Sequence, residues 1–298
     1  MIAIGDADRA TVPATVRRRT RRWRRRPPII SLTLFTVLVI LAIFAPLIAP
    51  ESPLKINLAN ASQVPFFMKG GSTAHLLGTD NLGRDILSRV IYGSRTTLGL
   101  AAVVLFVGAA IGVTVGLASG YLGGGTDMVV QRLVEAILSL PTIMVALVFA
   151  FLLGQSFTTV VVILAPFIAA RFARMVRGDV LAIRSMGYVE LAQVAGASTA
   201  RIIRRHILPN VAGTIIVIAT LEFGQLILLE ASLSFLGVGV PPPTPEWGLM
   251  VSEGEQYIAT KFWISLFPGL AIVASVLAIN LIGDWLRDYL DPKRAERR

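Results

Sequence analysis

The sequence contains no cysteine, which excludes disulfides, thiolate metal sites and a cysteine nucleophile. Lysine is also rare, and none of the four lysines lies in the G-x4-G-K-[ST] pattern of a phosphate-binding loop. The two histidines, His75 and His206, fall outside every apolar segment long enough to cross a membrane. This placement argues against a zinc site or a serine protease within a bilayer. We therefore expect no cofactor to be bound by this chain.

Charged residues make up only 15% of the chain, whereas 54% of the residues are hydrophobic and the mean hydropathy is +0.71. A water-soluble protein of this length needs a charged surface, so we expect lipid to surround much of the chain. Six apolar segments approach the roughly 20 residues that cross a hydrocarbon core as a helix. They are 29–49, 98–118, 133–153, 157–176, 211–240 and 262–282. The sequence thus predicts an all-α integral membrane protein with six transmembrane helices.

The net charge of +10 would suggest a nucleic-acid partner on a soluble surface, but the basic residues are segregated. Of 28 lysines and arginines, 22 fall in the amino tail, the loop around Arg132, the segment 171–205 and the carboxyl tail, and six fall in the alternating segments. By the positive-inside rule, both termini are predicted to be cytoplasmic, and no nucleic acid is expected to bind. The first apolar segment also resembles a signal peptide, but no small-x-small cleavage site precedes Pro50, so we expect a retained anchor.

The predicted organisation follows from these spans. It comprises a basic cytoplasmic tail (1–28), an anchor helix (29–49), an extracytoplasmic loop (50–95), a core of five transmembrane helices (96–286) with a cytoplasmic loop (177–209), and a cytoplasmic tail (287–298). The extracytoplasmic loop ends in an amphipathic stretch that predicts an interfacial helix. Its apolar face would contain Ile86, Leu87, Val90 and Ile91, opposite Asp85, Ser88 and Arg89. The proline-rich segment 241–245 is expected to end the fifth span.

Glycines recur at every fourth position of the second span, which predicts a helix face that another backbone approaches closely. These glycines are Gly108, Gly112, Gly116 and Gly120. The alternative is the general enrichment of glycine in membrane helices.

Acids inside lipid are costly, so those within the apolar segments should face protein or an aqueous path. The candidates for a translocation path are Glu135, Glu222, Gln225 and Glu230, of which Glu222 and Gln225 share one helix face. Interhelical hydrogen bonding without any contact to a substrate is the competing interpretation.

The segment 190–209 is predicted to form two short helices that are broken at Gly196, with Ser198 or Thr199 capping the second. The same pattern occurs in DNA-binding helix-turn-helix motifs, but no separate hydrophobic core surrounds this segment, and membrane spans flank it. A docking surface for a soluble partner explains it better. We expect Gly196 to adopt a positive φ or to admit the backbone of that partner.

This segment resembles the E-A-A-x3-G-x9-I-x-L-P loop with which ABC importer permeases dock on their ATPase subunit. The matching residues are Glu190, Ala192, Gly196, Leu208 and Pro209, whereas Leu191 and His206 depart from the pattern. The stretches 75–89, 230–248 and 280–292 resemble, more narrowly, the C-type permease subunit of dipeptide and oligopeptide importers. The resemblance covers roughly residues 20 to 292.

The resemblance implies the type I importer architecture, in which spans two to six form the core. It also implies a location in the bacterial cytoplasmic membrane and a short peptide as substrate. The implied partners are a B-type permease subunit, one or two cytoplasmic ABC ATPase subunits that bind ATP and magnesium, and an extracytoplasmic binding protein. Two alternatives stay open, namely an ABC importer of nickel chelates or another small solute, and an ion-coupled secondary transporter that uses the buried acids as proton sites.

Overall fold

The computed structural model describes residues 27–290, so the basic amino tail and most of the carboxyl tail lie outside the described residues. Within that range the chain is helical, and the single β-bridge joins Thr79 to Asp85. The helices are α1 (Ile29–Ile43), α2 (Ala45–Ile48), α3 (Ile86–Leu122), α4 (Gly124–Ser139), α5 (Thr142–Leu153), α6 (Phe157–Arg184), α7 (Gly187–Val194), α8 (Thr199–Ile202), α9 (Leu208–Phe235), α10 (Trp247–Glu255) and α11 (Trp263–Leu290). The 3-10 turn Leu58–Asn60 lies in the loop before α3, and the π-helical turn Ile203–Ile207 joins α8 to α9.

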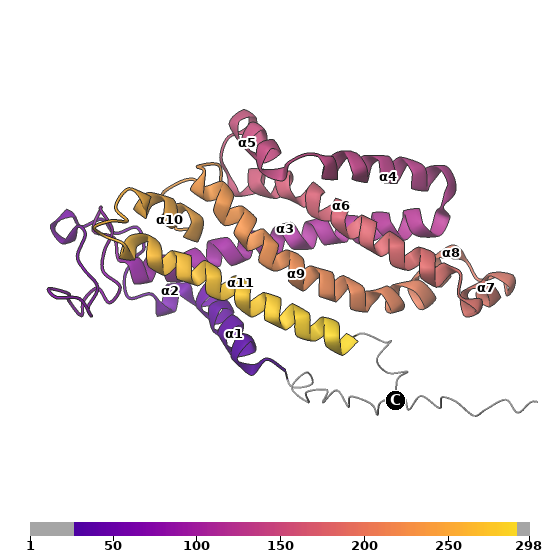
Figure 1. Cartoon of the computed structure of the whole chain (residues 1–298), viewed down its shortest axis with the longest axis horizontal. Helices are drawn as coiled ribbons and strands as arrows, with labels where there is room; N and C mark the ends of the chain where they lie inside the picture. The colour runs from indigo at the N-terminus through magenta and orange to yellow at the C-terminus, as the bar shows by residue number, and fades with distance from the viewer. Residues whose placement is uncertain (1–26, 291–298) are drawn as a thin grey trace, which may run out of the picture.

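Four continuous helical stretches are long and apolar enough to cross a membrane: α3, α6, α8 to α9 (Thr199–Phe235), and α11. The pair α4 and α5 would form a fifth crossing, and α1 is a shorter apolar helix of 15 residues. The predicted all-helical architecture is therefore confirmed for residues 27–290, whereas the count of six crossings stays a prediction. The long helices lie side by side, with α10 and the loop before α3 at one end of the bundle and α7 and α8 at the other (Figure 1).

The segment 133–153, which was predicted to form one transmembrane helix, is divided between two helices in the structure. This segment belongs to α4 and α5, which meet at an angle of 85°. Leu140, between the two helices, is extended with φ −87° and ψ 134°. The cause is local, because the ring of Pro141 clashes with a helical conformation of the residue before it.

The predicted interfacial helix is also different in the structure, since its residues form the first two turns of α3. Its polar face points inward, and Arg89 and Asp85 are only 1% and 3% exposed. Ile86 and Ile91 of the predicted apolar face are buried as well, and ion pairs hold the polar face inside the protein, as described below. The fifth apolar segment likewise ends earlier than predicted, because α9 stops at Phe235 and Gly237 adopts a φ of +78°.

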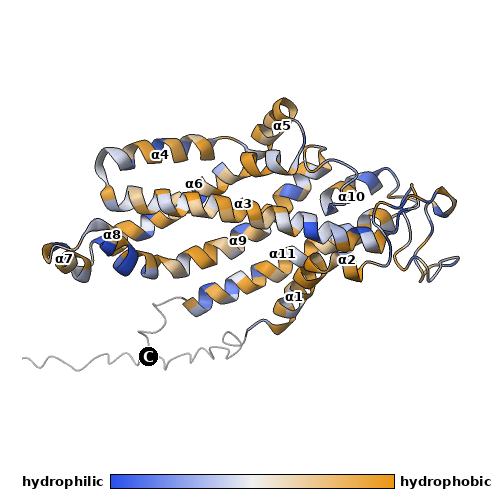
Figure 2. Ribbon diagram, turned by 180° about the vertical axis from the view of Figure 1, so that it is seen from behind, coloured by the Kyte–Doolittle hydropathy of each residue, from blue (hydrophilic) through white to orange (hydrophobic). Residues whose placement is uncertain are grey.

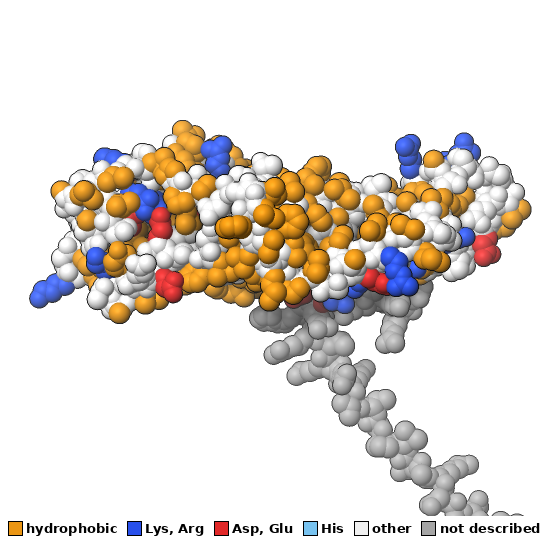
Figure 3. Space-filling view, turned by 90° about the horizontal axis from the view of Figure 1, so that it is seen from above, with side chains coloured by type: hydrophobic (Ala, Val, Ile, Leu, Met, Phe, Trp, Pro, Cys, Tyr) orange, Lys and Arg blue, Asp and Glu red, His pale blue; other side chains and the backbone are white. Residues whose placement is uncertain are grey.

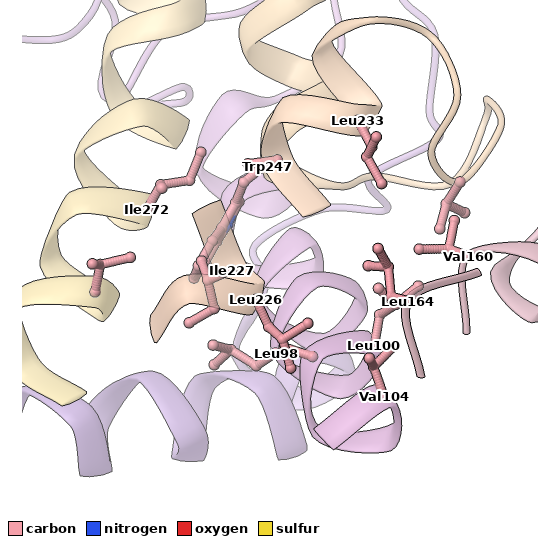
Figure 4. Packing of buried hydrophobic residues seen from close by; sticks show 14 of the residues in the cluster. Leu98, Leu100, Val104, Val160, Leu164, Leu226, Ile227, Leu233, Trp247 and Ile272 are labelled. Carbon is pink, nitrogen blue, oxygen red and sulfur yellow. The ribbon is translucent and has the colours of Figure 1, made fainter. Parts of the chain in front are cut away.

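The main core lies where α3, α6 and α9 meet near α10. It contains Leu98, Leu100 and Val104 of α3, Val160 and Leu164 of α6, Leu226 and Ile227 of α9, and Trp247 of α10 (Figure 4). Large apolar side chains also lie on the outside of the helices, with Phe106 of α3 77% exposed and Phe151 of α5 89% exposed. Figure 2 shows that hydrophobic residues make up much of these helices. On the face seen in Figure 3, the visible charged side chains gather toward the two ends, and the middle is mostly apolar. A surface of this kind suits lipid or further subunits rather than water.

Candidate functional site

The segment Gly187–Ile202, here named the α7–α8 element, projects from one end of the bundle (Figure 1). Its turn has the hydrogen bonds of a Schellman motif, since the amide of Ala197 donates to the carbonyl of Ala192 and that of Gly196 donates to the carbonyl of Gln193. Gly196 has a φ of +77°, in the left-handed region that was expected for it. Ser198 occupies the N-cap position of α8, although its side chain makes no capping hydrogen bond.

Few contacts hold the α7–α8 element to the bundle. Val189 is fully buried, and Ala192 packs beside it in a small apolar cluster with Tyr121 at the end of α3. The side-chain amide of Gln193 donates to the hydroxyl of Tyr121 at 3.3 Å. Leu208 and Pro209 start α9 and do not interrupt the chain direction, because the helical stretch Thr199–Phe235 is continuous. The α7–α8 element is thereby continuous with a helix that is long and apolar enough to cross a membrane.

The outward face of the α7–α8 element is open. Glu190 is exposed, and Leu191 and Val194 beside it are 70% and 86% exposed. No described atom lies within 4 Å of the position that a Cβ of Gly196 would occupy. Two exposed aliphatic side chains that lie beside a charged residue and a glycine with free space around it are typical of a surface that binds another protein.

The four glycines of α3 are buried and all face α6. A Cβ added to Gly112 would lie 2.3 Å from the carbonyl oxygen of Ala169, and a Cβ at Gly108 would lie 2.6 Å from Ile168. At Gly116 and Gly120 the closest contacts would both be 2.8 Å. The two helices therefore approach closely along the whole predicted face.

The structure brings together two of the four path candidates. Glu222 and Gln225 of α9 line a cavity of about 340 Å³, together with Arg171 of α6 and the break between α4 and α5. The Nη1 atom of Arg171 donates to Oε2 of Glu222 at 2.9 Å. Glu135, in contrast, lies on an exposed face of α4 beside Arg132, at 3.5 Å. Sequence reasoning treated Arg171 only as a residue near the membrane interface, although an arginine inside an apolar segment was itself a signal of a buried acidic partner.

Glu230 lies away from that cavity, fully enclosed and paired with Glu246, just before α10. The two residues are 1% and 0% exposed, their carboxyl groups repel each other, and no described group donates a hydrogen bond to either oxygen of Glu230. Burial raises the pKa of the Glu246 carboxyl, although the amide of Gly248 donates to its Oε1 at 3.1 Å and opposes this shift. Two adjacent carboxylates cannot both stay ionised without a cation, and neither can donate a hydrogen bond unless it carries a proton. A proton on one of the two groups would relieve their repulsion and would let that group donate a hydrogen bond between α9 and α10.

A second charged cluster was missed by the sequence analysis. Asp80 accepts from Nε of Arg84 and Nη1 of Arg89, both at 2.6 Å. Glu253 of α10 accepts from the same two arginines, at 3.1 and 2.7 Å. These four residues, here named the outer cluster, fasten the loop before α3 to α10. Among residues 27–290 no group of three histidines or acids is placed to hold a metal ion.

Comparison with known proteins shows the family to which this sequence is similar. Residues 108–296 match the family described as binding-protein-dependent transport system inner membrane component, and residues 17–65 match the N-terminal transmembrane domain of oligopeptide transport permease C. The chain is 40% identical over 97% of its length to a putative peptide transport system permease of Brucella suis, covering 94% of that protein. It is also 40% identical to a dipeptide transport system permease of Alkalihalophilus pseudofirmus, over 89% of this chain and 85% of the relative.

A glutathione transport system permease of Escherichia coli is 40% identical to the chain, over 92% of this chain and 89% of the relative. Among solved structures, the MetNI methionine ABC transporter in an inward-facing conformation is similar, with a TM-score of 0.56 and 24% identity. That likeness covers 68% of this chain and 96% of the other, and it concerns the fold.

Proposed function

This chain belongs to the family of binding-protein-dependent transport system inner membrane components, and from this premise we propose how its surfaces serve the import of short peptides. It is a multi-pass permease subunit of an ABC importer, with the type I importer architecture. Members of this family are membrane components without catalysis, and separate ATPase subunits hydrolyse ATP. Family membership decides against the ion-coupled alternative. The names of the relatives support peptides as the substrate class.

The α7–α8 element is the docking surface for the ATPase subunit in this proposal, and its exposed face carries the argument. Leu191 and Val194 leave water when a partner covers them, which contributes roughly 1.5–3 kcal/mol for each fully buried side chain before the costs of association. Glu190 adds a charge-assisted contact in the first turn of α7. Because the helix continues from Thr199 into α9, movement of the docked ATPase is transmitted to a membrane helix.

Replacement of Gly196 by aspartate tests this proposal. The substituted side chain would project into the space that the partner needs and would bring an unpaired charge into the contact. We expect Gly196→Asp to abolish co-purification of the ATPase and peptide uptake while membrane insertion stays normal. Glu190→Ala should weaken association by about 1 kcal/mol, or roughly fivefold.

A matched control separates docking from backbone strain. Gly124 also has a positive φ, of +58°, and also has no described atom within 4 Å of a Cβ position, but it lies at the start of α4. Gly124→Asp should therefore carry the same strain and leave ATPase association unchanged. Normal uptake by Gly196→Asp, or an equal loss in both variants, would contradict the docking role.

The proposal assigns the remaining partners to two other surfaces of the bundle. Arg171, Glu222 and Gln225 lie on a side of α6 and α9 that lipid would not solvate, so the proposal places the B-type permease subunit and the peptide path there. The loop before α3 and α10 form the surface for the extracytoplasmic binding protein. This assignment requires both termini to be cytoplasmic, and a topology reporter fused near residue 65 should report the outside.

A further inference from the structure

The cavity between α5, α6 and α9 is lined by charged residues that play no part in the docking of the ATPase subunit. Its volume of about 340 Å³ is enough for several water molecules or a small organic group. Its wall is mostly apolar, but one sector carries the ion pair of Arg171 and Glu222, with Gln225 one helical turn from Glu222. The side chains of the pair keep 31% and 15% exposure, so both remain accessible from the cavity.

This ion pair lies halfway along both of its helices. Arg171 is 14 residues after the start of α6 at Phe157, and Glu222 is 14 residues after the start of α9 at Leu208. At 1.5 Å per residue this places each about 21 Å from a helix end, inside helices that are long and apolar enough to cross a membrane. The cavity is also lined by Pro141 and Thr142, where the backbone of α4 and α5 is interrupted. Interrupted backbone at membrane depth is tolerated where it lines a cavity, and in transporters such breaks surround the substrate.

A charged pair at this depth is a poor choice for stability alone. Removing two charges from water costs several kcal/mol per ion, and a well-packed apolar pair is often equally stable or more stable. The pair also leaves capacity unused, because Arg171 has five N–H donors and one of its contacts is with Glu222. Because the ion pair is accessible and has unused donors and acceptors, its two side chains can separate and each bind a ligand group of opposite charge.

We propose that this cavity binds the two charged ends of a short unblocked peptide during translocation, with Arg171 binding the carboxylate and Glu222 binding the ammonium group. The inference rests on the proposed function as a peptide permease. One ion pair is replaced by two, so the total charge in the cavity is zero before and after the exchange. A planar guanidinium matches a carboxylate with two parallel hydrogen bonds, and a glutamate oxygen accepts from an ammonium group. Gln225 supplies an amide that can contact the peptide backbone between these ends.

The test compares uptake of a free dipeptide with uptake of its N-acetylated and C-amidated forms, using the complete transporter in proteoliposomes with its binding protein. Selection by the binding protein is the same for every variant, so a change in the ratio of free to blocked peptide reports on the permease. We expect Glu222→Gln to lower uptake of the free dipeptide at least tenfold and to remove the discrimination against the N-acetylated form. Arg171→Met should do the same for the C-amidated form.

Two further variants keep the inference open to refutation. Glu135→Gln removes an acid from another apolar segment outside the cavity, and its uptake ratios should equal those of the wild type. The double variant Arg171→Glu with Glu222→Arg preserves an ion pair, so it should assemble but fail to restore uptake. Restoration of wild-type uptake and ratios by this exchange would show that the pair is structural only. If the wild type takes up no peptide at all, the proposed function fails, whereas unchanged ratios in active variants overturn this inference alone.

Discussion

The close contact between α3 and α6 offers a quantitative test at Gly112. An added Cβ would stand 2.3 Å from the carbonyl oxygen of Ala169 and 2.6 Å from Cβ of Phe172. Neither atom belongs to a flexible side-chain end that can rotate away. Ordinary contact starts near 3.4 Å, so α6 would have to retreat by about 1 Å. A gap of this size forfeits a quarter to a half of each lost dispersion contact along the shared face.

The magnitude of the effect can be bounded with a control in the same helix. Overpacking of this kind costs about 1–3 kcal/mol. Gly99 also lies in α3, but no described atom is within 4 Å of its Cβ position. Gly99→Ala should stabilise the helix by about 0.5–1 kcal/mol through its helix propensity alone. Gly112→Ala gains the same helix propensity, so it should be less stable than Gly99→Ala by the overpacking cost alone, roughly 1–3 kcal/mol.

Thermal unfolding of the purified permease complex in detergent measures this difference. The transition temperature of Gly112→Ala should fall below that of the wild type by several degrees, and that of Gly99→Ala should stay equal or rise. Gly112→Leu should prevent assembly of the complex altogether. Equal transition temperatures for the two alanine variants, with normal assembly of the leucine variant, would refute the close packing of α3 on α6.

Two further predictions concern the end of the bundle that contains α10 and the loop before α3. Asp80→Asn should destabilise the complex by about 3 kcal/mol, because it leaves Arg84 and Arg89 buried with less negative charge. The control is Glu51→Gln, which removes an exposed ion pair with Lys55. It should cost about 0–1 kcal/mol in the same thermal assay. Deprotonation of Glu246 should weaken the junction of α9 with α10, because it would place a buried negative charge beside Glu230. Since burial raises the pKa of Glu246, the folded state holds protons that the unfolded state releases, so stability should fall as the pH rises above the ordinary glutamate range of about 4.3. Glu230→Gln replaces one carboxyl group by a neutral amide that can donate a hydrogen bond, so it should flatten this pH dependence. An unchanged slope would contradict a role of this pair in the pH dependence.

Much of the protein was determined by short-range properties of the sequence. Long apolar segments predict membrane helices because the cost of burying charge in lipid acts on each segment separately. The turn at Gly196 was predictable because a Schellman motif depends on neighbouring residues, and the structure gives this glycine a φ of +77°. The fourfold glycine spacing predicted a close contact, but the sequence did not name α6 as the helix that makes it.

Tertiary structure decided which polar groups meet. Arg171 and Glu222 are separated by 51 residues, and Arg84 and Glu253 by 169, so no local pattern predicts either pair. The same limit explains why the polar face at Arg89 was assigned to the membrane surface, although it lies inside the outer cluster. Four acidic or amide candidates looked alike in sequence, and packing alone separated the cavity residues from Glu135 at the surface and Glu230 in the interior. Burial and charge pairing depend on the arrangement of helices in space, and that arrangement is set by the sum of many contacts between distant segments.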